Sequence, residues 1–559
     1  MVARSQSIVG LSGDMARVVA IAVLFTLAAC GGGSGGGSAP GGSSGNGTQA
    51  TYTSLAEQCA APRPAGTIDP LTGEAYGDVQ GSLTIEKEWI RSYVNETYLF
   101  YADVPIVNPA PYVIGATVPY VDPTDNSSST ELLTSNYDVV DAYFNSQRSP
   151  YFTASGKPKD QFHFTYVTSV WDALETAGNE AGFGFTAAVL AAVPPRNVVV
   201  AYTQPNSPAT QLAMPLMRGY QFLTANGVDV INDSSSSGVA TLNEAFFSPI
   251  PGNTYTFTWI DPQTLATGTA VMVAGNITST PVLVAGTLPA PNASIGYILF
   301  NEHVATSESE LIDAVTLLET SNGGAGVSDL VLDIRYNGGG LLDIASELAY
   351  MIAGPIPTTG AAFETETFNN KNPFGLTVAE ATTPFHNVTQ GFSTVAGTAL
   401  PYLSLSRVYV LTGSDTCSAS EAIINGLRGV GIEVIQIGDT TCGKPYGFYP
   451  QDNCSTTYFT LQFQGVNNVG FGAYADGFIP GGTGGAGNDL PGCVVADDFT
   501  EPLGNPAEAR LAAALQYRAN ASCPAVAIGP PGTVKHGTPA RHPLLVRGPA
   551  HESKILLRK

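Results

Sequence analysis

The sequence is poor in positive charge. Its 559 residues include 23 Lys and Arg against 46 Asp and Glu, a net charge of −23, and only 8 of the basic residues are lysines. A surface this acidic disfavours nucleic acid as a partner, because phosphate binding needs Lys and Arg to replace counterions. The length exceeds what a single core supports and predicts two to four domains.

Cysteine is also scarce, and its spacing does not suit zinc. The 7 cysteines form no Cys-x-x-Cys pair and show no Cys/His spacing of a zinc site. All but Cys30 lie beyond the N-terminal apolar run, and an even number in an exported chain favours disulfides, whose pairing the sequence leaves open. Past that first run, no apolar stretch is long enough to be a membrane span.

The first residues have the pattern of an export signal. A short apolar run, Val18 to Leu27, follows Arg17 and ends in Leu27-Ala28-Ala29-Cys30. The run is too short to span a bilayer but suits the core of a signal peptide. Its end resembles a bacterial lipobox, in which the cysteine is lipidated. Residues 1–29 are therefore predicted to be a lipoprotein signal peptide, with an ordinary secretory signal as the alternative.

Residues 30–50 are predicted to be a flexible tether. The stretch from Gly31 to Gly47 is almost pure Gly and Ser, which behaves as a random coil. Gly31, rather than Asp, after the lipobox cysteine favours by resemblance a lipid anchor in the outer membrane of a bacterial envelope. The signal is compatible with a start at either Met1 or Met15.

The rest of the chain divides by pattern into three folded parts and a tail. Residues 51–181 have mainly helical spacing and predict an N-terminal helical domain, whereas 182–277 are rich in strand and turn signals. From 290 to 520 strands and helices alternate, which predicts right-handed crossovers and a largely parallel sheet. Residues 524–559 contain Pro, Gly and basic residues and are predicted to be a disordered tail.

Three loops follow predicted strands of the alternating part. They are Asp333-Ile334-Arg335-Tyr336-Asn337-Gly338-Gly339-Gly340, Thr416-Cys417-Ser418-Ala419-Ser420-Glu421 and Gly438-Asp439-Thr440-Thr441-Cys442-Gly443-Lys444. Because sites in parallel sheets form at the carboxyl ends of the strands, we expect all three loops at one edge of the sheet.

These loops resemble the S41 family of serine proteases, the C-terminal processing or tail-specific peptidases. The family pattern is Asp-Leu-Arg-x-Asn-x-Gly-Gly, then Ser-Ala-Ser-Glu, then Gly-Lys about two dozen residues later, and the resemblance covers about 82–518. It implies an α/β multidomain fold with a ClpP/crotonase-like parallel-sheet core. By position it implies a serine nucleophile, a lysine general base, and an oxyanion hole that uses two backbone amides. These residues are Ser418, Lys444, and Ala419 with either Gly339 or Gly340.

The chemistry of these residues agrees with the implied roles. Ser418 would open a helix after a strand, where free amides and the helix dipole favour a developing negative charge. A lysine can take the serine proton only when it is neutral, and burial lowers a lysine pKa in the required direction. Only Lys371 and Lys444 lie between 290 and 520, so the choice of base is narrow. Asp333 and Arg335 are interpreted as organising their loop.

The segment 182–277 resembles a PDZ domain. Gly182-Phe183-Gly184-Phe185 is similar to the loop whose backbone amides capture a peptide C-terminus while the peptide adds a strand, which assigns peptide binding to Phe183, Gly184 and Phe185. Tyr220, after Arg218-Gly219, departs from the acidic residue that is usual there, and a β-rich spacer without a ligand is the alternative.

Other interpretations of the site remain open at this stage. The candidate histidines for a Ser-His-Asp triad before the C-terminal tail are His163, His303 and His386, none of which lies in a Gly-rich loop. Ser418 and Glu421 have the spacing of a helix capping box. Gly429 stands where many family members carry an aspartate, which favours a plain dyad.

Two cysteines flank the predicted dyad. If the dyad forms, Cys417 and Cys442 must approach each other, and a disulfide between them is compatible with the geometry; Cys442 with Cys454 is the competing pair.

The sequence therefore predicts a lipid-anchored serine endopeptidase of envelope or exported proteins. It would take protein or peptide substrates, with no metal and no nucleotide. The alternative is a catalytically silent lipoprotein of the same fold that binds peptides or apolar ligands.

Overall fold

The computed structural model describes residues 50–70, 72–123, 126–153, 155–177, 179–482, 484–485, 487–524 and 554–555. The predicted signal peptide, Cys30, the tether and most of the predicted tail lie outside these residues. Within the described ranges, every helix is too short or too polar to serve as a membrane span.

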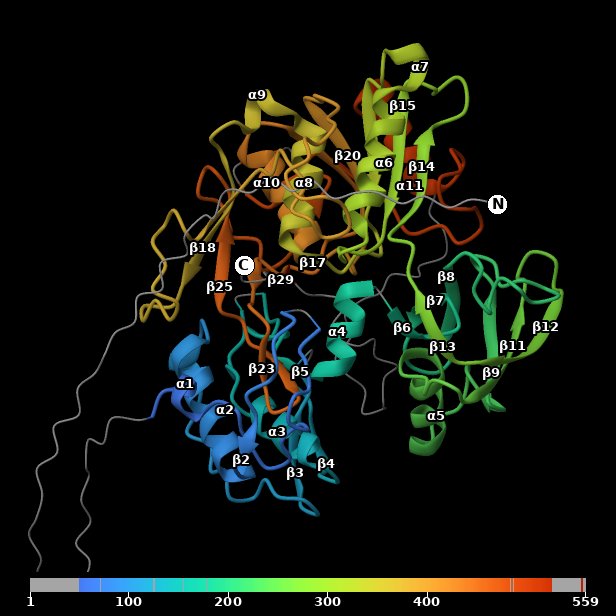
Figure 1. The fold of residues 1–559 in the computed structure, drawn as a ribbon. Helices are drawn as coiled ribbons and strands as arrows, with labels where there is room; N and C mark the ends of the chain where they lie inside the picture. The colour runs from blue at the N-terminus through green and yellow to red at the C-terminus, as the bar shows by residue number, and fades with distance from the viewer. Residues whose placement is uncertain are drawn as a thin grey trace, which may run out of the picture. The chain divides into compact units, whose positions relative to one another are not determined.

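A six-stranded sheet forms the centre of the alternating part, in the order β14-β15-β16-β20-β21-β28 (Figure 1). The last five strands are mutually parallel, and β14 is antiparallel at one edge. The prediction of a largely parallel sheet is thus confirmed. The strand bounds are Val282–Thr287, Ile295–Phe300, Asp329–Asp333, Arg407–Thr412, Glu433–Gly438 and Gly492–Val494.

Helices cover both faces of this sheet, so its strands are buried on both sides. Ile298 and Phe300 of β15 point into the core that contains α6, α8 and α10. Tyr297 and Leu299 point to the opposite face, where they pack with Leu511 of α11. This alternation follows from the two-residue period of a strand. The helices are α6 Ser307–Glu319, α8 Leu342–Ala353, α10 Ala419–Gly429 and α11 Ala509–Asn520, with short α7 Ser321–Gly324 and α9 Pro355–Thr358.

A second sheet, β19-β18-β25-β22, extends from the same part of the chain. Its strands are Thr382–Pro384, Ala362–Phe368, Phe463–Val466 and Tyr446–Gly447, and a small parallel pair is formed by β26 Ile479–Pro480 and β27 Asp489–Leu490. Lys444 thus lies between β21 of the central sheet and β22 of this one.

The β-rich part is a sheet in the order β12-β11-β9-β8-β7, with β10 paired to β9 and a helix, α5 (Figure 1). Its core is aromatic and contains Phe183, Phe222, Phe257 and Trp259. The bounds are β7 Phe185–Ala191, β8 Asn197–Thr203, β9 Gln221–Ala225, β10 Val228–Asp229, α5 Ser236–Phe247, β11 Thr254–Ile260 and β12 Thr267–Val273; β6 Asn179–Gly182 and β13 Gly275–Thr278 pair separately.

The N-terminal part is less helical than the spacing predicts. It contains α2, α3 and α4, but also an antiparallel pair, β3–β4, and a strand, β5, that pairs with β24 of the alternating part. β3 and β5 consist mostly of β-branched and aromatic residues, which favour strand over helix, whereas β4, Ser-Ser-Thr-Glu-Leu, has no such composition. The bounds are α1 Tyr52–Leu55, β1 Gln58–Cys59, β2 Val79–Gln80, α2 Leu83–Thr97, η1 Tyr101–Asp103, β3 Thr117–Val121, β4 Ser128–Leu132, α3 Asn136–Asn145, β5 Phe164–Val167 and α4 Thr168–Ala177; β24 is Thr456–Phe459 and its hairpin partner β23 is Gln451–Asn453.

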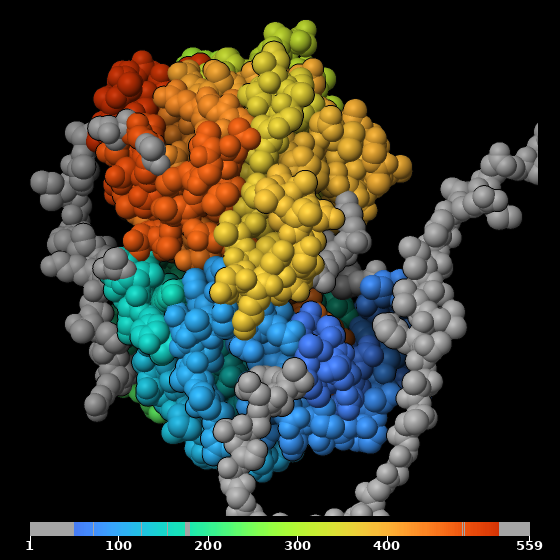
Figure 2. All heavy atoms as spheres, turned by 90° about the vertical axis from the view of Figure 1, so that its left-hand side faces the viewer, coloured from blue at the N-terminus to red at the C-terminus, as the bar shows by residue number. Residues whose placement is uncertain are grey.

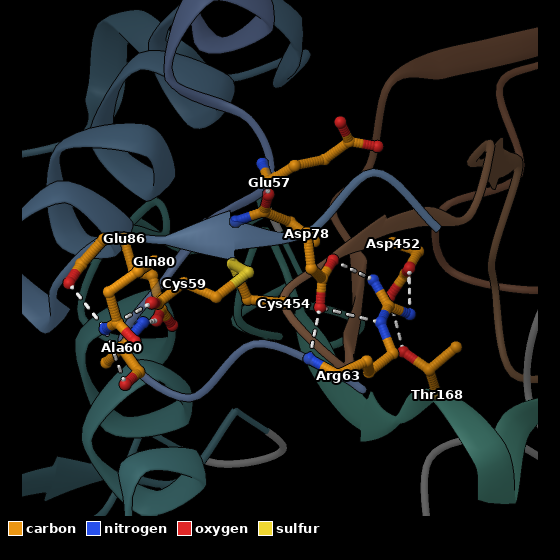
Figure 3. The surroundings of a disulfide bond; sticks show 12 residues. Glu57, Cys59, Ala60, Arg63, Asp78, Gln80, Glu86, Thr168, Asp452 and Cys454 are labelled. Carbon is orange, nitrogen blue, oxygen red and sulfur yellow. Dashed lines mark hydrogen bonds and ion pairs between the residues drawn. A yellow bond between two sulfur atoms is a disulfide. The ribbon is translucent and has the colours of Figure 1, made fainter. Parts of the chain in front are cut away.

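The N-terminal part is covalently joined to that hairpin. A disulfide links Cys59 to Cys454, and beside it the Arg63 guanidinium lies between Asp78 and Asp452, each 2.7 Å away (Figure 3). The two carboxylates hold the pKa of Arg63 above its usual value, against the effect of burial. In the space-filling view the N-terminal atoms, in blue, pack directly against the yellow and orange atoms of the alternating part (Figure 2). Strand pairing, a disulfide and ion pairs thus hold these two parts together.

Candidate active site

The three predicted loops lie at one edge of the central sheet. They follow β16, β20 and β21, which are adjacent and parallel, so their carboxyl ends are neighbours. The expectation from topology is therefore met for all three loops.

Ser418 occupies a strained turn between β20 and α10. Its backbone has φ 60° and ψ −112°, a conformation that L-residues rarely adopt, and it stands at the N-cap of the helix. A strained strand-to-helix turn of this kind also carries the serine of the nucleophile elbow in α/β-hydrolases. The residue is fully buried, and its Oγ has no hydrogen-bond partner among the described residues.

Lys444 is fully buried in an aromatic pocket. Its Nζ stands 4.2 Å from the ring centre of Phe448 and 4.5 Å from that of Phe162. Phe448 follows β22, whereas Phe162 comes from the N-terminal part, just before β5. The pocket of the predicted base is therefore completed by a segment more than 280 residues away in sequence.

A buried carboxyl group, Asp160, belongs to the same surroundings. It accepts hydrogen bonds from the Tyr98 hydroxyl at 2.6 Å and from the Phe162 amide at 2.8 Å. Burial raises the pKa of Asp160, while the hydrogen bond from Tyr98 and the positive charges of Arg148 and Lys444 oppose that rise. The acid thus lies within the electrostatic field of the lysine. Sequence reasoning missed Asp160 and Phe162, because no local motif surrounds them.

Glu421 joins the nucleophile loop to the lysine loop. One of its carboxylate oxygens, Oε2, accepts the Ser418 amide at 2.9 Å and the Lys444 amide at 2.8 Å. The other, Oε1, accepts the Gly443 amide at 2.9 Å and the Thr441 hydroxyl at 2.5 Å. Because both amides share one oxygen, the backbones of Ser418 and Lys444 lie within about 6 Å of each other. The capping-box spacing in the sequence therefore marks a residue that also assembles the site.

A disulfide braces the same two loops. Cys417 is bonded to Cys442, with the Cα atoms 5.2 Å apart, and the Cys442 amide donates to the Thr416 carbonyl at 3.0 Å. The predicted pairing of Cys417 with Cys442 is confirmed, and the competing partner, Cys454, is instead bonded to Cys59. Cys417, Glu421 and Cys442 are also the one cluster of potential metal ligands in the described part of the chain, but both sulfurs are in the disulfide and offer no thiolate to a metal.

The glycine loop is held by Asn337 and His303. The Asn337 Oδ1 accepts the Gly339 amide at 3.0 Å and contacts His303 Nδ1 at 2.9 Å, while the His303 backbone bonds to Gly339 and Leu341 on either side of Gly340. A side chain at Gly340 would approach the His303 carbonyl oxygen to 2.3 Å, and its φ is 131°, so only glycine fits. The Asn337 carbonyl in turn accepts the Cys417 amide at 3.1 Å and so joins this loop to the nucleophile loop.

Asp333 and Arg335 organise this loop, as the sequence predicts. The buried guanidinium of Arg335 is bidentate to Asp333, at 2.9 and 2.8 Å, and to Glu508 of α11, at 2.7 and 3.0 Å. It also donates to Asp497 at 2.7 Å. These carboxylates hold the pKa of Arg335 far above its usual value despite burial, so the guanidinium stays charged. Its hydrogen bonds to the three carboxylates fix the position of the loop.

The candidate histidines do not form a triad with Ser418. His163 is stacked on Phe144, and burial lowers its pKa to about 3. Burial also lowers the pKa of His303 to about 3, while its ring supports Asn337. His386 pairs with Asp343 at 2.7 Å. None of the three bonds to the Ser418 hydroxyl, which has no hydrogen-bond partner among the described residues.

The β-rich part contacts the glycine loop through Arg218. Its guanidinium donates to the Tyr336 hydroxyl at 2.6 Å and to Asp497 at 2.6 Å, and the Tyr336 hydroxyl also bonds to Asp497. Since Asp497 is shared with Arg335, one charged cluster connects the β-rich part to the predicted oxyanion loop.

The predicted peptide loop precedes β7, the edge strand of the β-rich sheet. Gly184 has φ 80°, and the cavity beside it, about 70 Å³, is lined by Phe183, Phe185 and Phe246 of α5 among others. The cavity is lined by the start of edge strand β7 and the end of α5, next to this loop. Two carboxylates, Glu180 and Glu302, line the same cavity.

Comparisons with known proteins agree with the geometry. Residues 294–452, which contain all three loops, match the model of peptidase family S41. Among solved structures, the chain is similar to a Bacteroides fragilis NCTC 9343 protein assigned to the S41 proteases, with 20% identity over 80% of this chain and 99% of that one and a TM-score of 0.52. It also aligns with the photosystem II D1 C-terminal processing protease, with 17% identity, coverage of 72% and 93%, and a TM-score of 0.38. A comparison with curated proteins finds no match. The part of the chain that carries the three loops, residues 294–452, is therefore a domain of peptidase family S41.

Proposed function

We propose that this protein is a serine endopeptidase in which Ser418 is the nucleophile and Lys444 the general base. The observation that carries the proposal is the shared oxygen of Glu421, which draws the amides of both residues to one point. A surface lysine and an ordinary helix cap would not need a buried carboxylate to hold them together. The disulfide between their neighbouring cysteines supports the same convergence.

The reaction follows acyl transfer through a dyad. The Ser418 Oγ attacks the peptide carbonyl carbon while Lys444 Nζ accepts its proton. The tetrahedral intermediate then releases the amine, which receives that proton from Lys444, and leaves an ester on Ser418. Water, deprotonated by the lysine, hydrolyses the ester and restores the serine.

The lysine pocket suits this role. A lysine acts as a base only in its neutral form, and the rings of Phe162 and Phe448 keep water from Nζ. The N-terminal part thereby contributes to the site through Phe162.

For the oxyanion hole, the hydrogen bonds favour Gly340 over Gly339. The Gly339 amide donates to Asn337 Oδ1 and is therefore occupied within its own loop. Ala419, as the first residue of α10, presents its amide at the helix N-terminus. We propose that Ala419 and Gly340 stabilise the developing oxyanion.

The remaining parts of the proposal concern substrate and place. The β-rich part would act as a PDZ-like module in which a peptide adds to edge strand β7 beside α5. The carboxylates of Glu180 and Glu302 disfavour capture of a free carboxylate there, so strand addition is the better-supported half of that prediction. The lipid anchor at Cys30 and an outer-membrane location remain proposals from the sequence.

The test is cleavage of an unstructured protein by a chain that lacks residues 1–49, beside Ser418→Ala and Lys444→Ala. We expect only the unsubstituted chain to cut. Equal cutting by all three chains would place the nucleophile elsewhere. No cutting by any of them would favour the silent peptide-binding lipoprotein.

A further inference from the structure

A segment near the end of the chain lies against the glycine loop. Lys554–Ile555 forms a short strand, β29, that pairs in parallel with β17, which is Gly340–Leu341; Gly340 is opposite Lys554 and Leu341 is opposite Ile555. The same segment contacts β22, Tyr446–Gly447, which begins two residues after Lys444. In Figure 1, β29 is drawn beside β17. The segment thus lies between the loop that carries the predicted oxyanion donor and the loop that carries the predicted base.

The orientation of the Gly340 backbone shows which edge of β17 pairs with β29. On one side of β17, the His303 backbone bonds to Gly339 and to Leu341. Successive residues of a strand direct their amides and carbonyls to opposite sides, so the polar groups of Gly340 point away from His303 and toward β29. The predicted oxyanion amide therefore faces the edge that the segment covers. An extended substrate that pairs with the backbone of Gly340 would use this edge.

Charge also favours this contact. Residues 525–559 contain 6 of the 23 basic residues and only 1 of the 46 acidic ones, so a segment of net charge +5 belongs to a chain of net charge −23. The rest of the protein is correspondingly acidic and attracts a basic segment at moderate ionic strength.

We propose that Lys554–Ile555 is an internal competitor that occupies the substrate edge of β17. Resting on the proposed peptidase function, this inference identifies the ligand of that edge as an extended peptide backbone added in parallel to Gly340–Leu341. The chain's own segment takes this position until a substrate displaces it. Because the segment is tethered, its effective concentration is on the order of millimolar, and it competes even with weak intrinsic affinity.

The first experiment does not depend on activity. In chains that carry Ser418→Ala, a fluorescent peptide with the sequence of residues 550–559 is titrated by anisotropy against the full chain and against full chains with Ile555→Pro or Leu545→Pro. Proline has no amide N–H, so it weakens strand pairing only at position 555. We expect the Ile555→Pro chain to bind the peptide at least tenfold more tightly than the other two. A chain that ends at Pro524 should bind the peptide as tightly as the Ile555→Pro chain does.

The second experiment measures kinetics with serine in place. The Ile555→Pro chain should have a lower KM than the full chain, with kcat unchanged, and the peptide of residues 550–559 should inhibit it competitively. Equal KM values for the full, Ile555→Pro and Leu545→Pro chains, together with equal peptide binding, would overturn the inference. If the binding differences appear but no chain cleaves, the internal ligand stands and the peptidase proposal fails. If the chains cleave but show none of these differences, the peptidase proposal stands and the internal ligand fails.

Discussion

Replacing Glu421 by glutamine tests whether one buried carboxylate assembles the site. Glu421 accepts three backbone amides, from Ser418, Gly443 and Lys444, and the Thr441 hydroxyl. A glutamine has one acceptor oxygen, and its amide group would face either Gly443 or both Ser418 and Lys444. At least one buried amide therefore loses its partner in Glu421→Gln.

The size of the effect follows from two opposing contributions. An unsatisfied buried amide costs about 1–3 kcal/mol, and the remaining bonds lose the strength that a charged acceptor gives. Burial, however, raises the pKa of Glu421, which shows that the ionised group is costly to desolvate, and glutamine removes that cost. We expect a net loss of about 1–3 kcal/mol in the free energy of unfolding. A shift of about 1 Å between the two loops would lower kcat/KM by about a hundredfold.

The assay separates these effects. Urea unfolding is measured in the Ser418→Ala background, and kcat/KM is measured with serine in place. Glu433→Gln is the matched control, because Glu433 is exposed at the start of β21. If Glu421→Gln unfolds at the same urea concentration as the parent and keeps its kcat/KM, the carboxylate does not position the dyad, and the convergence of the loops needs another cause.

Three further predictions concern the pocket, the brace and a buried acid pair. Phe162→Ala should lower kcat/KM by admitting water to Lys444, and Phe162→Leu should restore most of it; equal activity of both variants would exclude this role of the ring. Removing the Cys417–Cys442 disulfide by a double substitution to serine should lower the free energy of unfolding by about 3 kcal/mol and should also lower kcat/KM. The same change at Cys493 and Cys523, which opens a loop of similar length, should lower stability alone. Burial, and then the charge of Glu308, raise the pKa of Glu347 to about 9. Between about pH 4.5 and 9 this carboxyl is protonated in the folded chain but ionised in the unfolded chain, so the free energy of unfolding falls as pH rises, by up to about 1.4 kcal/mol per pH unit. Urea midpoints at pH 5, 7 and 9 should therefore fall more steeply for the parent than for Glu347→Gln, and parallel curves would contradict this assignment.

Local pattern was sufficient where the chemistry is local. The sequence predicts that Ser418 opens a helix after a strand, and the structure has the strand Arg407–Thr412 before Ser418 and a helix that begins at Ala419. Parallel topology then brought the three loops to one edge. Even the Cys417–Cys442 pairing follows once both residues are taken to flank one site.

Local pattern was insufficient where a contact joins distant segments. Phe162 has no motif around it, and only the pairing of β5 with β24 brings it to Lys444. The strands of the N-terminal part were missed for a related reason. Helical spacing around Trp89 and Tyr93 is genuine in α2, but it does not extend to the alternating residues of Phe164–Val167. No feature of Lys554–Ile555 alone indicates a partner at Gly340.

The segment that matches the peptidase family does not by itself contain a complete site. Residues 294–452 include Ser418, Lys444 and the glycine loop, but the groups that fix them come from elsewhere. Asp497 and Glu508 neutralise Arg335 from beyond this range, and without them a buried guanidinium would keep only Asp333 as its partner. Phe162 closes the lysine pocket from the N-terminal part, which a disulfide and strand pairing attach to the hairpin after Lys444. The proposed catalytic chemistry would therefore depend on most of the folded chain, because both the cation beside the predicted oxyanion loop and the pocket of the proposed base depend on residues outside the matched segment.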